Sequence, residues 1–339
     1  MMMGDSFVSV FIPCYNEEST IPALLDSLRE QTYPLEHMEI VIADGMSDDR
    51  TREIISSYRI AHPDLKVELV DNPERFIPAG LNRAIAASHG DILIRMDAHS
   101  RPSKDYIERC VDVLEKTGAA NVGGRWIIEP SRTTWMARGI AAAAAHPLGA
   151  GGARYRINGE AGEVETVPFG AYPREWLQRV GGYDEALLTN EDYELNERLR
   201  ASGGKVWFDP SIQTVYYARG DVLSLWKQYA RYGFWKVKML RRYPGSIKWR
   251  QAIPPAFVLV FLLLLALAMV FRPARWLLGV QLWMYFLVLL LSGINEGLRK
   301  GVGILPGFLV AVPVMHFAWG GAFLVSVVDS MFGGRFDAD

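Results

Sequence analysis

The sequence is poor in cysteine and in net charge, and it lacks the glycine-rich loops of common nucleotide-binding folds. Only Cys14 and Cys110 occur among 339 residues, which excludes a disulfide framework and suits a reducing compartment. The 36 Lys and Arg residues nearly balance the 38 Asp and Glu residues, so nucleic acid is not expected as a partner. No GxGxxG or GxxxxGK[ST] pattern follows the first strand-like run, which argues against dinucleotide-binding and P-loop folds.

Charge is distributed very unevenly along the chain. Residues 252–339 carry nine charged side chains in 88 positions, and residues 1–251 carry the other 65. The beginning of the sequence has no basic segment followed by a long apolar one, so no cleavable signal peptide is expected. We therefore expect a cytosolic soluble domain followed by a membrane region. The predicted boundaries are 1–221 for the soluble domain, 222–250 for an amphipathic helix at the membrane interface and 251–332 for the membrane region.

Three apolar runs predict about three membrane spans. They are residues 252–271, 276–295 and 301–328. About 20 apolar residues in a helix cross a hydrocarbon core of roughly 30 Å. The third run contains two prolines and a Gly-Gly pair, so a kinked span and a pair of half-helices are both open.

Basic residues next to the runs predict the orientation in the membrane. Arg299 and Lys300 separate the second and third runs, whereas Arg272 and Arg275 in the short outer loop weigh against the same orientation. An excess of Lys and Arg marks the cytosolic side. Six basic residues precede the first run: Lys236, Lys238, Arg241, Arg242, Lys248 and Arg250. A multi-pass protein of the plasma (inner) membrane, with its soluble domain in the cytosol, is expected.

The soluble part alternates short β-branched runs with helical patterns. Such alternation predicts βαβ units and an α/β fold with a mostly parallel, Rossmann-like sheet, in which ligands bind beyond the carboxyl ends of the strands. The predicted strands are 7–12, 39–43, 66–70, 91–96 and 121–128, and the predicted helices are 18–31, 49–61, 78–88 and 103–117.

Polar side chains follow these strands. Asp44 follows the second strand, where a carboxylate can accept hydrogen bonds from a ribose or a base. Asp97 and His99 follow the apolar run 91–96 and are two residues apart. On an extended backbone they point the same way, and together they suit a divalent ion that bridges phosphates. A helix-capping Asp and a surface His are the alternative.

A second acidic site is the pair Glu191 and Asp192 at the expected start of a helix that continues through Arg200. Acidic residues in a first helical turn are favoured by the helix dipole and are common there. The alternative is a carboxylate base presented to an acceptor hydroxyl. Spacing alone does not decide between them.

A polyalanine run ending at Ala145, followed by a glycine cluster, predicts a helix and then a mobile loop. This loop is either a lid over an acceptor or a surface connection. We expect no chemical role for His146.

These segments, in this order, resemble glycosyltransferase family 2, inverting enzymes with the GT-A fold. The similar segments are residues 10–18, 42–45, 95–99 and 189–192. The resemblance covers about residues 7–220 and is strongest to membrane-bound succinoglycan-type exopolysaccharide glucosyltransferases. It implies transfer of a sugar, with glucose expected, from a UDP-sugar to a polyprenyl-linked saccharide in exopolysaccharide or cell-surface glycan synthesis.

The resemblance also implies roles for individual residues. Asp97, with His99 where the family usually has a second Asp, would hold Mn²⁺ or Mg²⁺. Asp192 would be the catalytic base and Glu191 would support the acceptor. Asp97 would also contact the ribose and diphosphate of the nucleotide sugar. The remaining residues would line the nucleotide pocket, with Asp44 at the uracil: Pro13, Tyr15, Glu17 and Asp44.

The segment 223–236 interleaves Trp and Tyr with Lys and Arg, which suits a helix at the membrane interface. An ordinary helix packed on the sheet is the alternative. The resemblance places Gln228, Arg231 and Tyr232 at the family's Q-x-x-R-W motif, which borders the acceptor in processive synthases.

Three other functions compete with the leading one. A polyprenyl-phosphate glycosyltransferase has a phosphate acceptor that needs no base, so the acidic pair at 191–192 disfavours it. A processive polysaccharide synthase is disfavoured by Tyr232 in place of Trp. A transporter or channel subunit is disfavoured because Glu296 and His316 are its only intramembrane candidates.

Overall fold

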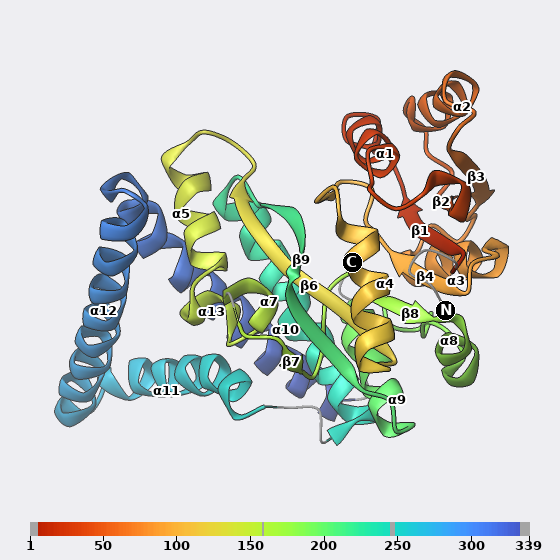
Figure 1. The fold of residues 1–339 in the computed structure, drawn as a ribbon. Helices are drawn as coiled ribbons and strands as arrows, with labels where there is room; N and C mark the ends of the chain where they lie inside the picture. Colours follow the sequence, from red (N-terminus) through yellow and green to blue (C-terminus); the bar gives the residue numbers. More distant parts are fainter. Residues whose placement is uncertain (1–5, 158, 245–247, 333–339) are drawn as a thin grey trace. The chain divides into compact units, whose positions relative to one another are not determined.

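The computed structural model describes residues 6–157, 159–244 and 248–332, and its contacts divide the chain into two compact units (Figure 1). The first unit comprises residues 1–127 and 158–216, and the second comprises 128–157 and 217–339. In the sequence of the first unit, 32 acidic side chains outnumber 18 basic ones, whereas in the second 18 basic side chains outnumber 6 acidic ones. The near-zero net charge of the chain therefore hides an acidic unit and a basic unit.

The first unit is built on one mixed sheet. The strand order is β3-β2-β1-β4-β8-β6-β9-β5, and β7 pairs with β9. Strands β3, β2, β1 and β4 are parallel, whereas β8 is antiparallel to β4 and β6, and β5 and β7 are antiparallel to β9. The strands are β1 (Val8–Cys14), β2 (Met38–Asp44), β3 (Lys66–Asp71), β4 (Ile92–Arg95), β5 (Arg101–Pro102), β6 (Asn121–Pro130), β7 (Gly162–Glu163), β8 (Ala171–Pro173) and β9 (Val206–Ala218).

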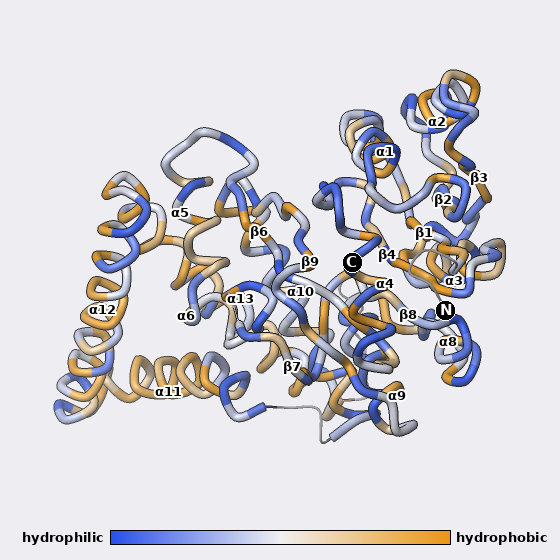
Figure 2. Tube along the Cα trace, in the orientation of Figure 1, coloured by the Kyte–Doolittle hydropathy of each residue, from blue (hydrophilic) through white to orange (hydrophobic). Residues whose placement is uncertain are grey.

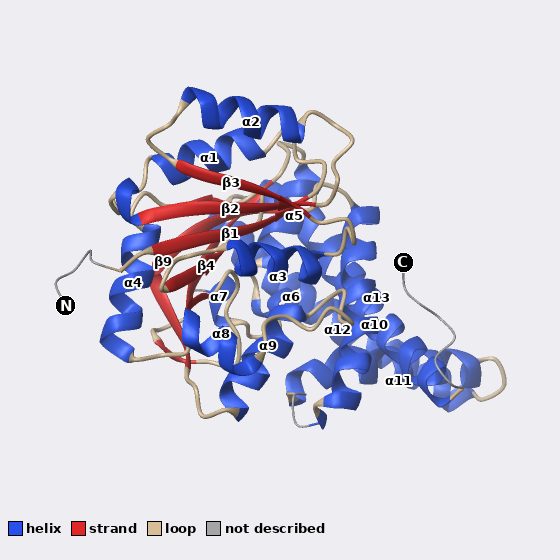
Figure 3. Ribbon diagram, turned by 90° about the vertical axis from the view of Figure 1, so that its right-hand side faces the viewer, coloured by secondary structure: helices blue, strands red, loops and turns tan. Residues whose placement is uncertain are grey.

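Helices cover both faces of the parallel strands, which lie side by side in Figure 3. Successive residues of a strand point to opposite faces. Val10 and Ile12 of β1 accordingly join one buried cluster with Leu24 of α1, whereas Phe11 joins another with Leu81 of α3. The helices of this unit are α1 (Ile21–Arg29), the 3₁₀ turn η1 (Leu35–His37), α2 (Thr51–Ala61), α3 (Ile77–Ala87), α4 (Tyr106–Thr117), α8 (Arg174–Val180) and α9 (Glu191–Ala201).

The α/β prediction is confirmed, and the strands and helices expected between residues 7 and 128 are present within a few residues of their predicted bounds. Cys14 and Cys110 are both buried and free. Beyond β4, the residue pattern predicted β6 but not β5, β7, β8 and β9. Three of them, β5, β7 and β8, have two or three residues each, too few for a periodic signal.

The second unit is helical. Its elements are α5 (Trp135–Ala144), α6 (Pro147–Ala150), α7 (Arg154–Ile157), α10 (Val222–Arg242), the 3₁₀ turn η3 (Trp249–Ala252), α11 (Ile253–Ala268), α12 (Arg272–Lys300), η4 (Val302–Ile304) and α13 (Leu305–Met331). The third apolar run forms one continuous helix, α13, with Pro313 inside it, so the half-helix alternative is wrong. The glycine cluster after α5 lies among two short helices, with Gly151 and Gly152 in left-handed conformations.

Three segments of the second unit are long and apolar enough to cross a membrane. They are Trp249–Ala268, Arg272–Lys300 and Val302–Met331, and Figure 2 shows hydrophobic residues along α11 and α12. About one-tenth of the apolar stretch of α11 and of α12 is buried inside the protein, against one-third of the apolar stretch of α13. Helix α13 packs on α5, α10 and α11, so it is the most enclosed of the three.

The crossing of α5 and α13 depends on two glycines. A Cβ at Gly139 would lie 2.3 Å from the Cα and carbonyl carbon of Gly307, whereas a Cβ at Gly279 of α12 meets nothing within 4 Å. We expect Gly139→Ala to destabilise the protein by about 1–3 kcal/mol, because the helices must separate. Gly279→Ala, the control, should be neutral or stabilise by up to about 1 kcal/mol. The thermal midpoints of both variants in detergent check this, and equal midpoints would contradict a tight crossing.

Candidate active site

The loops after β1 and β2 lie next to each other at the carboxyl edge of the parallel strands. Cys14 is opposite Asp44 in the register of β1 and β2. Asn16 and Met46 then turn the two loops through left-handed conformations, with φ of 54° and 58°. The Asn16 side-chain amide donates to Asp48 Oδ1 at 2.7 Å, and the Asn16 backbone N–H donates to Ser47 Oγ at 2.9 Å. These hydrogen bonds fix the two loops as one wall of the site.

Asp44, the last residue of β2, lies beneath these two loops. It is fully buried. Its carboxylate accepts hydrogen bonds from Ser47 Oγ at 2.5 Å, from the Ser47 backbone N–H at 3.0 Å and from Arg52 Nη1 at 2.8 Å. Arg52 Nη2 also donates to Asp71 Oδ1 at 2.8 Å. Asp44 therefore supports its own loop, and Ser47 and Arg52 stand between its oxygens and the solvent.

Two other side chains are exposed at this edge. Tyr15 is 43% exposed, and the guanidinium of Arg75 lies 5.8 Å from the centre of its ring. Arg75 has a left-handed backbone, with φ of 61°, in the loop after β3. A tyrosine ring and a guanidinium are flat groups that can stack on a base or donate to its oxygens. Tyr15 is among the residues predicted from the sequence, and Arg75 is not.

Asp97 and His99 lie in the turn after β4. His99 Nδ1 is 3.0 Å from Glu17 Oε1, so the loops after β1 and β4 meet. The side chains of Asp97 and His99 are 26% and 49% exposed, which leaves both accessible to a ligand. Burial favours the neutral form of Glu17, but hydrogen bonds from His99 and Thr20 outweigh it and hold the pKa of Glu17 below its ordinary value. The structure thus brings Glu17, Asp97 and His99 to one edge of the sheet.

The residues from 6 to 332 that the structure describes contain no group of three or more His, Cys, Asp or Glu side chains arranged to hold a metal ion. Asp97 and His99 offer one carboxylate oxygen and one imidazole nitrogen. Mn²⁺ accepts both ligand types, and a nucleoside diphosphate can supply further oxygens. The donor set therefore fits a divalent ion that binds together with a diphosphate rather than one held by protein alone.

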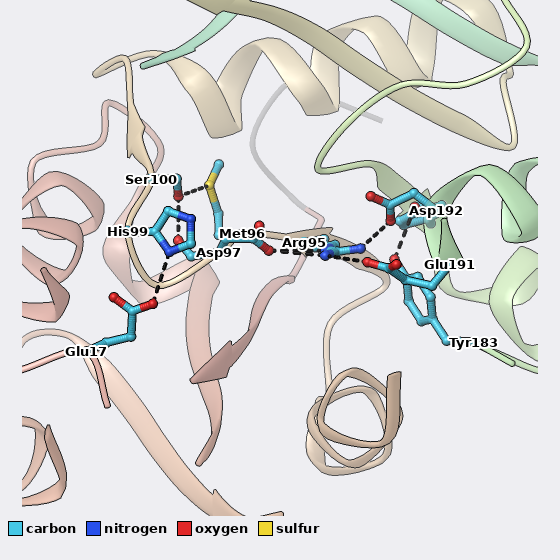
Figure 4. A network of polar contacts seen from close by, with 10 residues as sticks. Glu17, Arg95, Met96, Asp97, His99, Ser100, Tyr183, Glu191 and Asp192 are labelled. Carbon is cyan, nitrogen blue, oxygen red and sulfur yellow. Dashed lines mark hydrogen bonds and ion pairs between the residues drawn. The ribbon is translucent and has the colours of Figure 1, made fainter. Parts of the chain in front are cut away.

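Arg95 connects this edge to the acidic pair at the start of α9 (Figure 4). It is the last residue of β4, and its side chain is 4% exposed. Its Nε and Nη2 lie 3.3 and 3.2 Å from Asp97 Oδ1, Nη2 donates to Glu191 Oε1 at 3.1 Å, and Nη1 donates to Asp192 Oδ1. One buried guanidinium is thus the ionic partner of three carboxylates.

The acidic pair is presented by the first turn of α9. Asn190 precedes the helix in a left-handed conformation, with φ of 67°. Arg198 anchors the helix by donating to the carbonyl oxygens of Val180 and Gly182 and to Glu194. Burial raises the pKa of Asp192 to about 7, the Arg95 charge opposes this, and the charges of Glu191 and Asp97 add to it. A carboxyl that titrates near neutral pH suits proton transfer.

The remaining predicted residues, Gln228, Arg231 and Tyr232, lie on α10 of the second unit. Gln228 Nε2 donates to Tyr232 OH at 3.2 Å, and the Tyr229 and Tyr232 rings are 5.8 Å apart. Arg231 is exposed on the same helix. The three predicted residues therefore form part of one helical surface.

Comparisons with known proteins show which family the chain resembles. The sequence model of glycosyl transferase family 2 matches residues 9–181. The succinoglycan biosynthesis protein ExoA of Rhizobium meliloti is 34% identical over 326 residues, which is 94% of each chain. A dolichyl N-acetyl-α-D-glucosaminyl phosphate 3-β-D-2,3-diacetamido-2,3-dideoxy-β-D-glucuronosyltransferase of Methanococcus voltae is 29% identical over 268 residues, covering 77% of this chain and 83% of that protein.

A solved structure supports the fold. The mannosyltransferase PcManGT of Pyrobaculum calidifontis, in complex with GDP-Man and Mn²⁺, superposes with a TM-score of 0.62 at 22% identity, covering 92% of this chain and 87% of that one. The fold is thus of the GT-A type, with C-terminal helices apolar enough to span a membrane. On the family match and the full-length similarity to ExoA, the chain belongs to glycosyltransferase family 2.

Proposed function

We propose that this glycosyltransferase moves a sugar, with glucose expected, from a UDP-sugar to a hydroxyl of a lipid-linked saccharide, with inversion at the anomeric carbon. One observation carries the proposal: Arg95 forms ion pairs with Asp97, at the carboxyl edge of the parallel strands, and with Glu191 and Asp192. A donor-side carboxylate and a base for the acceptor thereby share one site. Similarity to a succinoglycan biosynthesis protein supports a role in exopolysaccharide or cell-surface glycan synthesis.

The nucleotide is proposed to bind against the wall formed by the loops after β1, β2 and β3. Tyr15 and Arg75 would contact the base, and Pro13 and Glu17 would line the pocket below it. Asp44 would act mainly through Ser47 and Arg52, which it holds at 2.5 and 2.8 Å. Because PcManGT is in complex with GDP-Man, the test of the UDP assignment includes guanine nucleotides.

Asp97 and His99 are proposed to hold Mn²⁺ or Mg²⁺ together with the diphosphate of the donor. A bound divalent ion supplies positive charge where negative charge develops on the departing diphosphate. Both side chains are accessible, and Glu17 beside His99 orients the imidazole through its Nδ1. A metal ion would then be bound through the other ring nitrogen, Nε2.

Asp192 is proposed as the general base. It takes the proton of the acceptor hydroxyl while that oxygen attacks the anomeric carbon on the face opposite the nucleoside diphosphate. The bond from the anomeric carbon to the acceptor oxygen forms as the bond to the diphosphate oxygen breaks. Glu191 supports the acceptor beside the base. One such displacement converts an α-linked donor sugar into a β-glycoside.

The second unit is proposed to place the reaction at the cytosolic face of the plasma membrane. Its surplus of basic residues suits the anionic cytosolic leaflet. Helix α10 has Trp226 exposed, Tyr229 buried and Arg241 and Arg242 in its last turn, which is typical of an interfacial helix. Gln228, Arg231 and Tyr232 are proposed to border the lipid-linked acceptor.

Polyprenyl phosphate is the alternative acceptor. The acidic pair argues against it, because a phosphate oxygen is already ionised and needs no base. The name of the Methanococcus voltae relative describes transfer to position 3 of a sugar that is already attached to dolichyl phosphate, which supports a hydroxyl acceptor.

The proposal is tested with the full chain purified in detergent. UDP-sugars and GDP-sugars are combined with lipid-linked saccharides or with polyprenyl phosphate, and nucleoside diphosphate release and product mass are followed. We expect UDP release from UDP-glucose and the addition of one hexose to the lipid-linked saccharide. Product formed only with polyprenyl phosphate would establish the alternative, and no release from any donor would refute both.

A further inference from the structure

Arg95 is an unusual side chain to find at the end of a central strand. The side chain is 4% exposed, and it extends from β4, which lies between β1 and β8 in the sheet. Its three ionic partners come from the turn after β4 and from α9. The guanidinium also lies 5.7 Å from the centre of the Tyr183 ring, in the segment between α8 and α9. A buried cation with partners 96 and 97 residues away in the sequence joins separate parts of the chain.

The number of its partners argues against a purely structural role. One guanidinium shares its charge among three carboxylates, so the cluster keeps an excess of negative charge in a largely buried place. Buried ion pairs are commonly no more stabilising than well-packed apolar residues of similar size. Arg198 shows what a structural arginine of this unit does, since it donates to one carboxylate, Glu194, and to the backbone carbonyls of Val180 and Gly182.

The guanidinium is suited to holding several carboxylates at fixed positions. It has five N–H donors in a rigid plane, whereas a lysine has one point charge on a flexible stem. Nη1 and Nη2 point to Asp192 and Glu191, and Nε together with Nη2 points to Asp97. The contacts to Asp97, at 3.2 and 3.3 Å, are the longest of the cluster, and the Asp97 side chain is 26% exposed, so it is the partner that an incoming ligand can reach.

We infer that Arg95 is a positioning residue that couples donor binding to the base. It holds Asp192 and Glu191 toward the acceptor, and it gives up its share of Asp97 when that carboxylate turns to the metal–nucleotide complex. Arg95 then has only the acidic pair as ionic partner, so the base is fixed most firmly when the donor is in place. This inference rests on the proposed function, because it takes Asp97 as donor-side ligand and Asp192 as base.

The test compares Arg95→Gln with the wild-type chain in two measurements, nucleotide binding and turnover, which we expect to respond differently. Binding of UDP, or of GDP, in the presence of Mn²⁺ is measured by calorimetry, and turnover is measured as nucleoside diphosphate release. We expect binding to be unchanged or up to about tenfold tighter, because Asp97 no longer shares its charge with Arg95. We expect turnover to fall about 10²-fold, the cost of a misplaced catalytic group. Binding more than tenfold weaker would overturn the inference.

Two further variants separate positioning from folding. Arg198→Gln perturbs the anchoring of α9 on Val180 and Gly182 and leaves Arg95 in place, so an equal loss of turnover there would overturn the inference. Arg95→Lys keeps the buried charge and is the variant to use if Arg95→Gln does not fold; it should retain nucleotide binding and lose turnover.

A double mutant tests whether Arg95 acts through Asp192. In Asp192→Asn, adding Arg95→Lys should change turnover by less than about threefold, since the effects of groups that act together are not additive. Additive losses would show independent roles.

The proposed function and this inference fail in different ways. Absence of Mn²⁺-dependent UDP and GDP binding to the wild-type chain would refute the proposed function. Normal wild-type binding and turnover, with binding and turnover lost together in Arg95→Gln and in folded Arg95→Lys, would refute the inference alone.

Discussion

Asp192→Asn is expected to lower turnover by about 10²–10⁴-fold while donor binding survives. Asparagine keeps the shape of the side chain and its hydrogen bond to Arg95, but it cannot accept the proton of the acceptor hydroxyl. The loss corresponds to roughly 3–5 kcal/mol of activation barrier. Donor affinity and turnover are to be measured on the same preparation, so that a folding defect appears as a loss of both.

The pH dependence gives an independent readout of the same group. Burial raises the pKa of Asp192 to about 7, and only the ionised carboxylate can act as base. Activity should therefore rise with pH through the neutral range, and this rising limb should be absent from the residual activity of Asp192→Asn. A flat profile in the wild-type chain between pH 6 and 8 would mean that another group accepts the proton.

A matched control separates catalysis from helix capping. Glu175 lies in the first turn of α8 in the same unit, so Glu175→Gln removes an N-terminal helix carboxylate outside the acidic pair. Such a carboxylate contributes under about 1 kcal/mol to stability. We expect turnover close to wild type for Glu175→Gln. If Asp192→Asn is also within threefold of wild type, the base assignment is wrong and a phosphate acceptor, which needs no base, becomes the better proposal.

The sequence predicted the part of the fold in which each element has its own periodic signal. The β-branched runs of β1, β2, β3 and β4 and the helices between them are long enough for their apolar positions to show a period. Strand β8 has three residues and owes its conformation to pairing with β4 and β6. Helix α13 contains Pro306, Pro313 and two adjacent glycines, which suggest a break, yet its packing on α5 and α10 holds it continuous.

The candidate site divides in the same way. Residues directly after strands, such as Tyr15, Asp97 and His99, could be named because parallel strands end at a common edge. Arg95 could not, since two of the three carboxylates that pair with it lie nearly a hundred residues away in the sequence. Arg75 was missed because its loop has no periodic pattern. A strand-end position also did not reveal that Asp44 is fully buried beneath Ser47 and Arg52.

Removal of divalent metal is expected to abolish transfer. Chelation should lower turnover by about 10³-fold or more, because the charge developing on the diphosphate loses several kcal/mol of stabilisation. Mn²⁺ should restore activity better than Mg²⁺, since an imidazole ligand suits the softer ion and Mg²⁺ prefers oxygen. Turnover with EDTA, and then with each added metal, gives the measurement.

His99→Asp tests the site itself, because it replaces the imidazole with a second carboxylate two residues after Asp97. If His99 binds the metal, this variant should remain active and should use Mg²⁺ nearly as well as Mn²⁺. His99→Ala should need a higher concentration of either metal, and Asp97→Asn should lose most activity at any concentration. His89→Ala is the control, because that histidine contacts Glu39 near the start of β2, at the opposite edge of the sheet. Full activity in chelator would refute the metal proposal, and an unchanged metal preference in His99→Asp would leave Asp97 as the protein's ligand and His99 as the partner of Glu17 alone.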